Sequence, residues 1–205
     1  QRQFEKVLDY FNQIITVADE LGNFRIKADI LDRKGMILFS LKRIDEALEQ
    51  HRLALDLYDQ VNIVRGKTTQ LNNIGYLLQE KGQLDEALGY YQRALTLDEQ
   101  INDLRGKAIR LTNIASIFEF QNQLDKALEL YNQGLAIKEQ QGDLEGQFIS
   151  LESIGRTLQK QGHLREALER YQQALNIAKE LNALSEILIF DKLIIELKEE
   201  IKSSS

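Results

Sequence analysis

A repeat of forty residues constrains the fold of this chain more than any other feature. The pentapeptide LNNIG at 71–75 recurs as LTNIA at 111–115 and LESIG at 151–155, with a weaker copy, LDRKG, at 31–35. An Ala-Leu pair follows sixteen residues after each leucine, at 47–48, 87–88, 127–128 and 167–168. Repeats of this length are typical of solenoids, in which each unit buries its apolar face only against its neighbours. The functional question therefore concerns a surface rather than a catalytic pocket.

The composition argues against several functional classes. The net charge is -6 and the two signs are interspersed, so no basic stripe for nucleic acid is present. The chain has no Cys, which excludes disulfides, thiolate metal ligands and cysteine nucleophiles, and suits a reducing, cytoplasmic location. No apolar run approaches the roughly 20 residues needed to span a bilayer. We therefore expect neither nucleic acid nor a membrane as partner.

Two helices are predicted in each repeat. Leu71, Ile74 and Leu78 lie three and four residues apart, which places them on one stripe of an amphipathic helix over about 64–80, named helix A. The spacing resumes at Ala87 and continues to about residue 100, which we name helix B. The junction between them holds residues that tolerate positive φ, and acidic residues then open helix B at the positive end of its dipole. The junction residues are Gly82, Asn122 and Gly162, and the acidic residues are Asp45, Asp85 and Asp125.

Small residues recur where the paired helices must approach closely. A large side chain there would overpack the contact, at a cost of about 1–3 kcal/mol. His51 takes the slot that Tyr91, Tyr131 and Tyr171 hold in later copies, so we interpret it as a packing residue rather than a ligand. The small residues are Gly35, Gly75, Ala115 and Gly155 on helix A and Ala47, Ala87, Ala127 and Ala167 on helix B; Gly66, Gly106 and Gly146 form a further set.

At these residues the chain resembles the tetratricopeptide repeat family, whose pattern is a large apolar residue, Leu-Gly, an aromatic and later Ala, Phe or Tyr, and Ala. The resemblance implies an all-α fold, a right-handed α-solenoid of antiparallel helix pairs. The period is forty instead of the usual 34, and the family's late proline is missing. A long-repeat branch that includes kinesin light chains and Leu-Gly-Asn-repeat proteins shares both departures. The segment 71–75 is similar to the Leu-Asn-Asn-Leu-Ala of kinesin light chains.

The repeats predict a single array over 1–205. The first residue is Gln and falls inside a repeat, so we expect a fragment of a longer protein. The segment Leu184 to Ile201 is apolar around most of its circumference, whereas a simple cap has a polar outer face. The predicted parts are a half repeat (helix B) at 1–23, full repeats at 24–63, 64–103, 104–143 and 144–181, and a terminal helix at 182–202.

The family resemblance also locates a candidate binding surface, because helix A lines the concave side of such arrays. The residues of helix A that do not face the core are apolar and aromatic in the first copies, amide in the middle and basic at the end. The predicted peptide-binding residues are Arg33, Met36, Phe39, Asn72, Asn73, Tyr76, Thr112, Asn113, Ser116, Phe120, Arg156 and Lys160.

Asn73 and Asn113 are the most suggestive members of this set. An amide both donates and accepts, so two of them one repeat apart could hold the backbone of an extended peptide. The alternative is that they bond to the neighbouring helix or to water. Of the positions that grip a chaperone carboxylate in the best-known variant of the family, only one matches, so we do not expect that ligand.

No motif for catalysis, cofactor or metal emerges from the sequence. Gly66-Lys67-Thr68 ends like a phosphate loop, but Val61 stands where the loop needs a glycine and no strand precedes it. Paired acids such as Asp45 and Glu46 recur once per repeat, whereas general acid–base pairs occur once, in a cleft. We expect no catalytic residues, no cofactor and no metal.

Three hypotheses about function follow. The first is a non-catalytic interaction module that binds a partner peptide or helix in the groove of helix A. The second is a regulatory or sensory array within a larger multidomain protein. The third is self-association through the apolar helix Leu184–Ile201.

Overall fold

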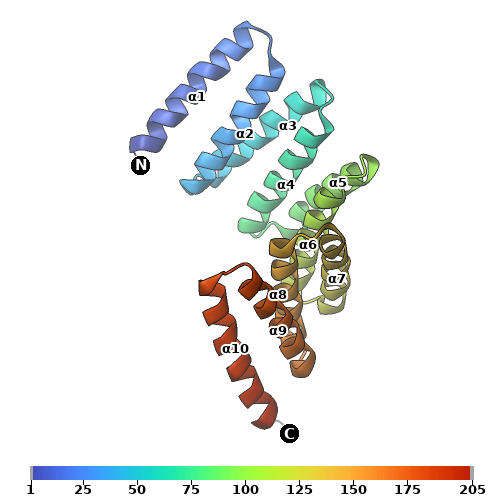
Figure 1. The fold of residues 1–205 in the computed structure, drawn as a ribbon. Helices are drawn as coiled ribbons and strands as arrows, with labels where there is room; N and C mark the ends of the chain where they lie inside the picture. Colours follow the sequence, from blue (N-terminus) through green and yellow to red (C-terminus); the bar gives the residue numbers. More distant parts are fainter. Residues whose placement is uncertain (1, 204–205) are drawn as a thin grey trace. The chain divides into compact units, whose positions relative to one another are not determined.

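The computed structural model describes residues 2–203, and these form ten α-helices joined by short turns (Figure 1). The all-α prediction is confirmed. Contacts divide the chain into two compact units, 1–102 and 103–205. The single array over 1–205 stays a prediction. Its end residues 1, 204 and 205 lie outside the described residues. Unit 1 contains α1 (Arg2–Glu20), α2 (Phe24–Ser40), α3 (Ile44–Gln60), α4 (Val64–Glu80) and α5 (Leu84–Gln100). Unit 2 contains α6 (Leu104–Phe120), α7 (Leu124–Gln141), α8 (Leu144–Lys160), α9 (Leu164–Glu180) and α10 (Leu184–Ser203).

The helices pair as the repeat predicts. Helix A over about 64–80 coincides with α4, and helix B of the same copy is α5. Within each copy helix A packs on its own helix B (α2 on α3, α4 on α5, α6 on α7, α8 on α9) more extensively than helix B packs on the next helix A of the same unit. Within each unit the helices therefore bury their apolar stripes against their sequence neighbours.

A ring of helix B lies directly on a glycine of helix A in three of the copies. A Cβ atom added to Gly75 would stand 2.8 Å from Cε1 of Tyr91, and one added to Gly155 would stand 2.6 Å from Cε1 of Tyr171. His51 lies on Gly35 in the same way and is buried, which confirms its interpretation as a packing residue. The missing side chain is therefore what allows each ring to enter the helix pair.

The second set of glycines is explained in two different ways. A Cβ on Gly66 would overlap the ring of Tyr58, so this glycine does admit a neighbouring helix. Gly146 instead makes room for the carboxylate of Asp143, which accepts a hydrogen bond from the Gly146 amide and begins α8. The close approach that the sequence suggested for this set thus holds for Gly66, whereas Gly146 makes room mainly for its own N-cap.

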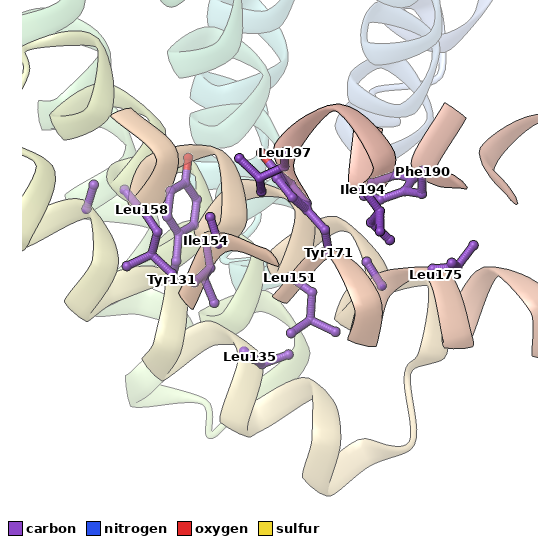
Figure 2. Close-up of a cluster of buried hydrophobic side chains, with 14 residues drawn as sticks. Tyr131, Leu135, Leu151, Ile154, Leu158, Tyr171, Leu175, Phe190, Ile194 and Leu197 are labelled. Carbon is purple, nitrogen blue, oxygen red and sulfur yellow. The ribbon is translucent and has the colours of Figure 1, made fainter. Parts of the chain in front are cut away.

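The largest core cluster of unit 2 shows how the rings and aliphatic side chains interdigitate (Figure 2). Tyr131 and Tyr171 are buried within it, and Phe190 of α10 meets the Tyr171 ring edge-on, with centroids 5.7 Å apart. In unit 1 a smaller cluster forms around Ala28, Leu31 and Tyr58. Both clusters are built from slots of the repeat.

The terminal helix α10 departs from the other A helices. Phe190, Ile194 and Leu197 are buried, whereas Leu184, Leu188, Ile189 and Ile195 are exposed. Ile195 stands forty residues after Gly155, in the slot that elsewhere admits the ring of a helix B. A ring could not approach α10 as it does the other A helices, so α10 presents an apolar face of a different kind.

Each inter-helix turn contains one residue in the left-handed conformation, at intervals of twenty residues. The prediction for Gly82, Asn122 and Gly162 is confirmed. Lys42 is the exception in residue type, since every other such position is Gly or Asn; its φ is 63°. Its amide donates to the Phe39 carbonyl and the next amide donates to the Leu38 carbonyl, which closes the end of α2.

We expect Lys42→Gly to stabilise the protein by about 0.5–1 kcal/mol. A side chain with a Cβ atom is strained in the left-handed region, and removing it outweighs the extra freedom that glycine gives the unfolded chain. The midpoint of thermal unfolding, followed by circular dichroism, should rise. The reverse change at the matched turn, Gly82→Lys, should lower it; a lower midpoint for Lys42→Gly would contradict the strain argument.

Candidate functional site

In three of the four copies a hydrogen bond ties the helix-B tyrosine to helix A. The hydroxyl of Tyr91 donates to Oε1 of Gln79 at 3.2 Å, and that of Tyr171 donates to Oε1 of Gln159 at 3.1 Å. Burial raises the pKa of Tyr171 to about 12, so its hydroxyl keeps its proton. In the third copy the acceptor is Glu119, whose Oε2 accepts a hydrogen bond from the Tyr131 hydroxyl at 3.0 Å. The acceptor stands twelve residues before the tyrosine in each copy.

The first copy lacks this pair. His51 replaces the tyrosine and Phe39 replaces the acceptor. Nδ1 of His51 lies 2.8 Å from Oε1 of Gln70 and 3.4 Å from Oδ1 of Asp32, so the ring finds its partners elsewhere. Phe39 is therefore left to meet the ring of Tyr76 edge-on, with centroids 5.4 Å apart.

A cleft of about 250 Å³ lies at this place in unit 1, between α2, α3 and α4. Four of the predicted peptide-binding residues come together there, namely Met36, Phe39, Asn73 and Tyr76, and the lining is completed by Ser40, His51 and Leu77. Met36 is 57% exposed and Tyr76 is 43% exposed, so the cleft faces solvent. Burial, together with the charge of Glu80, raises the pKa of Tyr76, which keeps it a neutral phenol.

Asn73 is fixed by its neighbour on helix A of the preceding copy. Its Nδ2 donates to Oδ1 of Asp32 at 3.1 Å. Burial disfavours the Asp32 carboxylate, but hydrogen bonds from His51, Gln70 and Asn73 outweigh that effect and hold its pKa below the usual value. One amide hydrogen of Asn73 therefore bonds to the neighbouring helix, which was the alternative considered for this residue. Its contact with a peptide stays a prediction.

The remaining predicted residues of unit 1 lie on the same helices but outside the lining of the cleft. Arg33 is exposed on α2, one residue from Asp32. Asn72 is half-buried on α4. Both remain candidates for contact with a bound segment that extends past the cleft.

The two basic residues predicted at the end of the surface are held in an ionic cluster in unit 2. Nε of Arg156 donates to Oε1 of Glu119 at 3.0 Å, and Nζ of Lys160 donates to the same oxygen at 2.7 Å. Glu119 is only 7% exposed. Burial opposes its charge, but the hydrogen bonds from Arg156 and Lys160 prevail and lower its pKa. Arg156 and Lys160 thus share one buried carboxylate, and both side chains remain about half exposed.

Thr112 is also engaged with the protein itself. Its hydroxyl donates to the Ala108 carbonyl at 3.0 Å and accepts from Nζ of the buried Lys138, also at 3.0 Å. Lys138 donates to Ser150 as well, and burial lowers its pKa despite the nearby Asp143. The last three predicted residues are distributed along α6: Asn113 and Ser116 are half-buried, and Phe120 is 71% exposed.

Sequence reasoning overlooked Glu119 as a residue that decides the charge of this surface. The signal was present, because Glu119 stands forty residues after Gln79 and forty before Gln159, so an acid replaces an amide in a periodic slot. Lys138 and Leu77 carried no comparable signal. Their positions depend on three-dimensional packing.

A larger cleft, of about 420 Å³, lies elsewhere in unit 1, between α3, α4 and α5. Charged residues of both signs line it, and Lys67 pairs with Asp59 at 2.7 Å. Over residues 2–203, no three His, Asp or Glu side chains are grouped so that they could hold a metal ion. No helix in that range is long and apolar enough to cross a membrane.

Comparison with known families accounts for this architecture. Family patterns described as tetratricopeptide repeat match residues 68–140 and 149–182, which together make up more than half of the chain. The chain belongs to the tetratricopeptide repeat family. Such arrays are in general non-catalytic and bind other proteins on extended surfaces. No curated protein sequence matches the chain significantly.

Solved structures of tetratricopeptide repeat arrays share the fold at low sequence identity. BtubC (BKLC) from P. vanneervenii is 19% identical over 88% of this chain and 75% of its own, with a TM-score of 0.80. Kinesin light chain-like repeats from P. anserina are 14% identical, covering 88% of this chain and 89% of theirs, with a TM-score of 0.72. The Rap conjugation gene regulator of plasmid pLS20, in complex with the Phr* peptide, is 15% identical over 97% of this chain, with a TM-score of 0.77. The chain spans about half of that regulator, 55% of its length.

We expect Glu119→Gln to preserve the fold of unit 2 and to remove an acid-sensitive contribution to its stability. Glutamine holds the same slot in two other copies and still accepts a tyrosine hydroxyl. Because the pKa of Glu119 is lowered in the folded state, its stabilisation is present above the unfolded pKa, about 4.3, and is lost as the pH falls through the folded value. Urea unfolding should show wild type more stable than the variant by about 1 kcal/mol at pH 7, with the gap closing near pH 3.

The matched control for this prediction is Glu152→Gln. Glu152 is an exposed carboxylate that lies 4.0 Å from the same Arg156. Its removal should change the stability little at either pH. A gap between wild type and Glu119→Gln that does not depend on pH would contradict the prediction.

Proposed function

We propose that the chain is a non-catalytic interaction module that binds an extended or helical segment of a partner protein along the exposed face of its A helices. The cleft of unit 1 carries this proposal. Met36, Phe39, Asn73 and Tyr76 come together in it, and it lies in the copy where His51 and Phe39 stand in place of the Tyr–Gln pair of the scaffold. Apolar clefts with a few oriented polar groups are the usual form of a binding site.

The peptide-bound Rap regulator supports the proposal by analogy, since its array has the same fold and its structure was solved with the Phr* peptide. The Rap regulator also supports the regulatory alternative, because this chain corresponds to 55% of its length. On that alternative the array would bind a peptide and pass the change to a further domain. Both readings need the same peptide-binding surface.

Selection from a displayed library of random twelve-residue peptides tests the proposal. We expect wild type to enrich a sequence family that Tyr76→Ala no longer binds, because truncating the ring removes one wall of the cleft. Leu53→Ala is the matched control: Leu53 is an apolar residue 45% exposed on α3, and it does not line the cleft. Enrichment that is equal for wild type and Tyr76→Ala would refute the assignment of the surface.

Self-association through α10 is the second candidate. Leu184 is 80% exposed and Leu188 74% exposed. Beside them a cleft of about 430 Å³ lies between the start of α8 and the start of α10, lined by Phe148, Ile149 and Leu181 among others. An apolar surface of this kind marks an interaction site on many proteins.

Light scattering coupled to size-exclusion chromatography tests self-association. If α10 joins two copies, the mass of wild type should rise with concentration toward that of a dimer, and Leu188→Glu should remain a monomer because it places a charge in the interface. A charge reversal at an exposed residue of the neighbouring helix α9, Glu169→Lys, should leave the mass as it is in the wild type. A wild-type monomer at millimolar concentration would exclude this role.

A further inference from the structure

The charge next to the cleft of unit 1 is negative and partly buried. The side chain of Asp32 is 22% exposed and bonds to Asn73 and His51, neither of which carries the permanent charge of Lys or Arg. Glu80 adds a second negative charge beside Tyr76. Asp29, one turn before Asp32, accepts the hydroxyl of Tyr58. Half-buried charges of this kind are screened much less by salt than charges at the surface.

The cations near the cleft are more exposed to solvent than Asp32. Lys42 lies with Nζ 5.6 Å from the centroid of the Phe39 ring, at the exposed end of α2. Arg33 is also exposed. Water and salt screen both of them, and His51 contributes a charge only when it is protonated. Of these charges, Asp32, which contacts the lining residues Asn73 and His51, is the least screened by solvent.

The cleft has the dimensions and the walls of a site for one side chain. Its volume of about 250 Å³ is below the range of roughly 300–1,000 Å³ that is typical of drug-sized ligands. Phe39 and Tyr76 offer aromatic surfaces, and Met36 offers an adaptable thioether wall. A large apolar side chain, such as Phe, Leu or Met, fits this surface. A cation next to it on the same peptide would lie near Asp32 and Glu80.

We infer that the cleft binds one large apolar side chain of a partner segment that carries Lys or Arg beside it, and that it rejects acidic segments. This inference rests on the proposed function and names the partner that suits it.

Four labelled nonapeptides test the inference by fluorescence anisotropy with the full chain. All share the frame Gly-Ser-Gly-x-x-x-Gly-Ser-Gly, and the central triplet is Lys-Phe-Lys, Ser-Phe-Ser, Glu-Phe-Glu or Lys-Ala-Lys. We expect Lys-Phe-Lys to bind about tenfold tighter than Glu-Phe-Glu, with Ser-Phe-Ser between them. Lys-Ala-Lys should bind at least about tenfold more weakly than Lys-Phe-Lys, because it cannot fill the cleft. Raising the salt concentration should narrow the difference between the charged peptides only slightly, because Asp32 is partly buried.

Two variants separate the apolar and the ionic parts of the inference. Tyr76→Ala should weaken every Phe peptide. Asp32→Asn keeps an oxygen that accepts from Asn73 but removes the charge, so it should reduce the preference for Lys-Phe-Lys over Glu-Phe-Glu several-fold. Glu49→Gln removes one exposed negative charge from α3 and should leave the preference unchanged. Circular dichroism verifies that each variant is folded.

The outcomes decide between the inference and the function on which it rests. Equal or tighter binding of Glu-Phe-Glu, or an unchanged preference in Asp32→Asn, would overturn the charge preference. If none of the four peptides binds, the inference also fails. In each of these cases the library selection still tests the proposed function separately. If it enriches neutral or acidic peptides whose binding requires Tyr76, the proposed function holds and only the preference for a basic partner is wrong.

Discussion

The close approach of a helix-B ring to a small residue of helix A is the contact on which the rest of this structure depends. Where Gly75 admits Tyr91, the ring is buried completely and its hydroxyl reaches across to Gln79. The apolar body of the ring supplies burial and the polar tip fixes its orientation, so a single side chain determines both the spacing and the register of the pair. A larger residue at the glycine would separate the helices and break the hydrogen bond at the same time. The forty-residue period repeats this contact, and the short turns with their left-handed residues bring the chain back for the next one.

The cleft of unit 1 arises where this contact is modified without being lost. His51 still packs on Gly35, so the helices keep their spacing, but it bonds to Gln70 and approaches Asp32 instead of reaching the position of Gln79. Phe39 needs no partner from helix B and turns its ring to Tyr76. The same exchange that preserves the scaffold therefore leaves an aromatic wall exposed to solvent. The candidate binding site therefore lies where the first copy departs from the repeat.

The sequence predicted the helices, the turns and the ring slots because each depends on spacing within one repeat. The range 64–80 for helix A agrees with α4, and His51 packs as its slot indicates. It predicted the candidate surface less completely. Met36, Phe39, Asn73 and Tyr76 were correctly grouped by their face of the helix, since periodicity defines a face. The pairing of Asn73 with Asp32, and of Arg156 and Lys160 with Glu119, joins residues 37 to 41 positions apart, and no local pattern specifies which of several neighbours a flexible side chain chooses.

One slot connects the scaffold to the charge of the surface. Phe39, Gln79, Glu119 and Gln159 occupy equivalent positions on the four A helices. Three of them accept a tyrosine hydroxyl, so an apolar replacement there would remove a hydrogen bond worth about 0.5–1.5 kcal/mol. An amide and a carboxylate both satisfy the hydroxyl, which allows the charge to change without harm to the fold. An apolar residue is tolerated only where the tyrosine has changed as well, as with Phe39 and His51. The scaffold thus permits three kinds of surface at this slot, neutral, acidic and aromatic, and the chain uses all three.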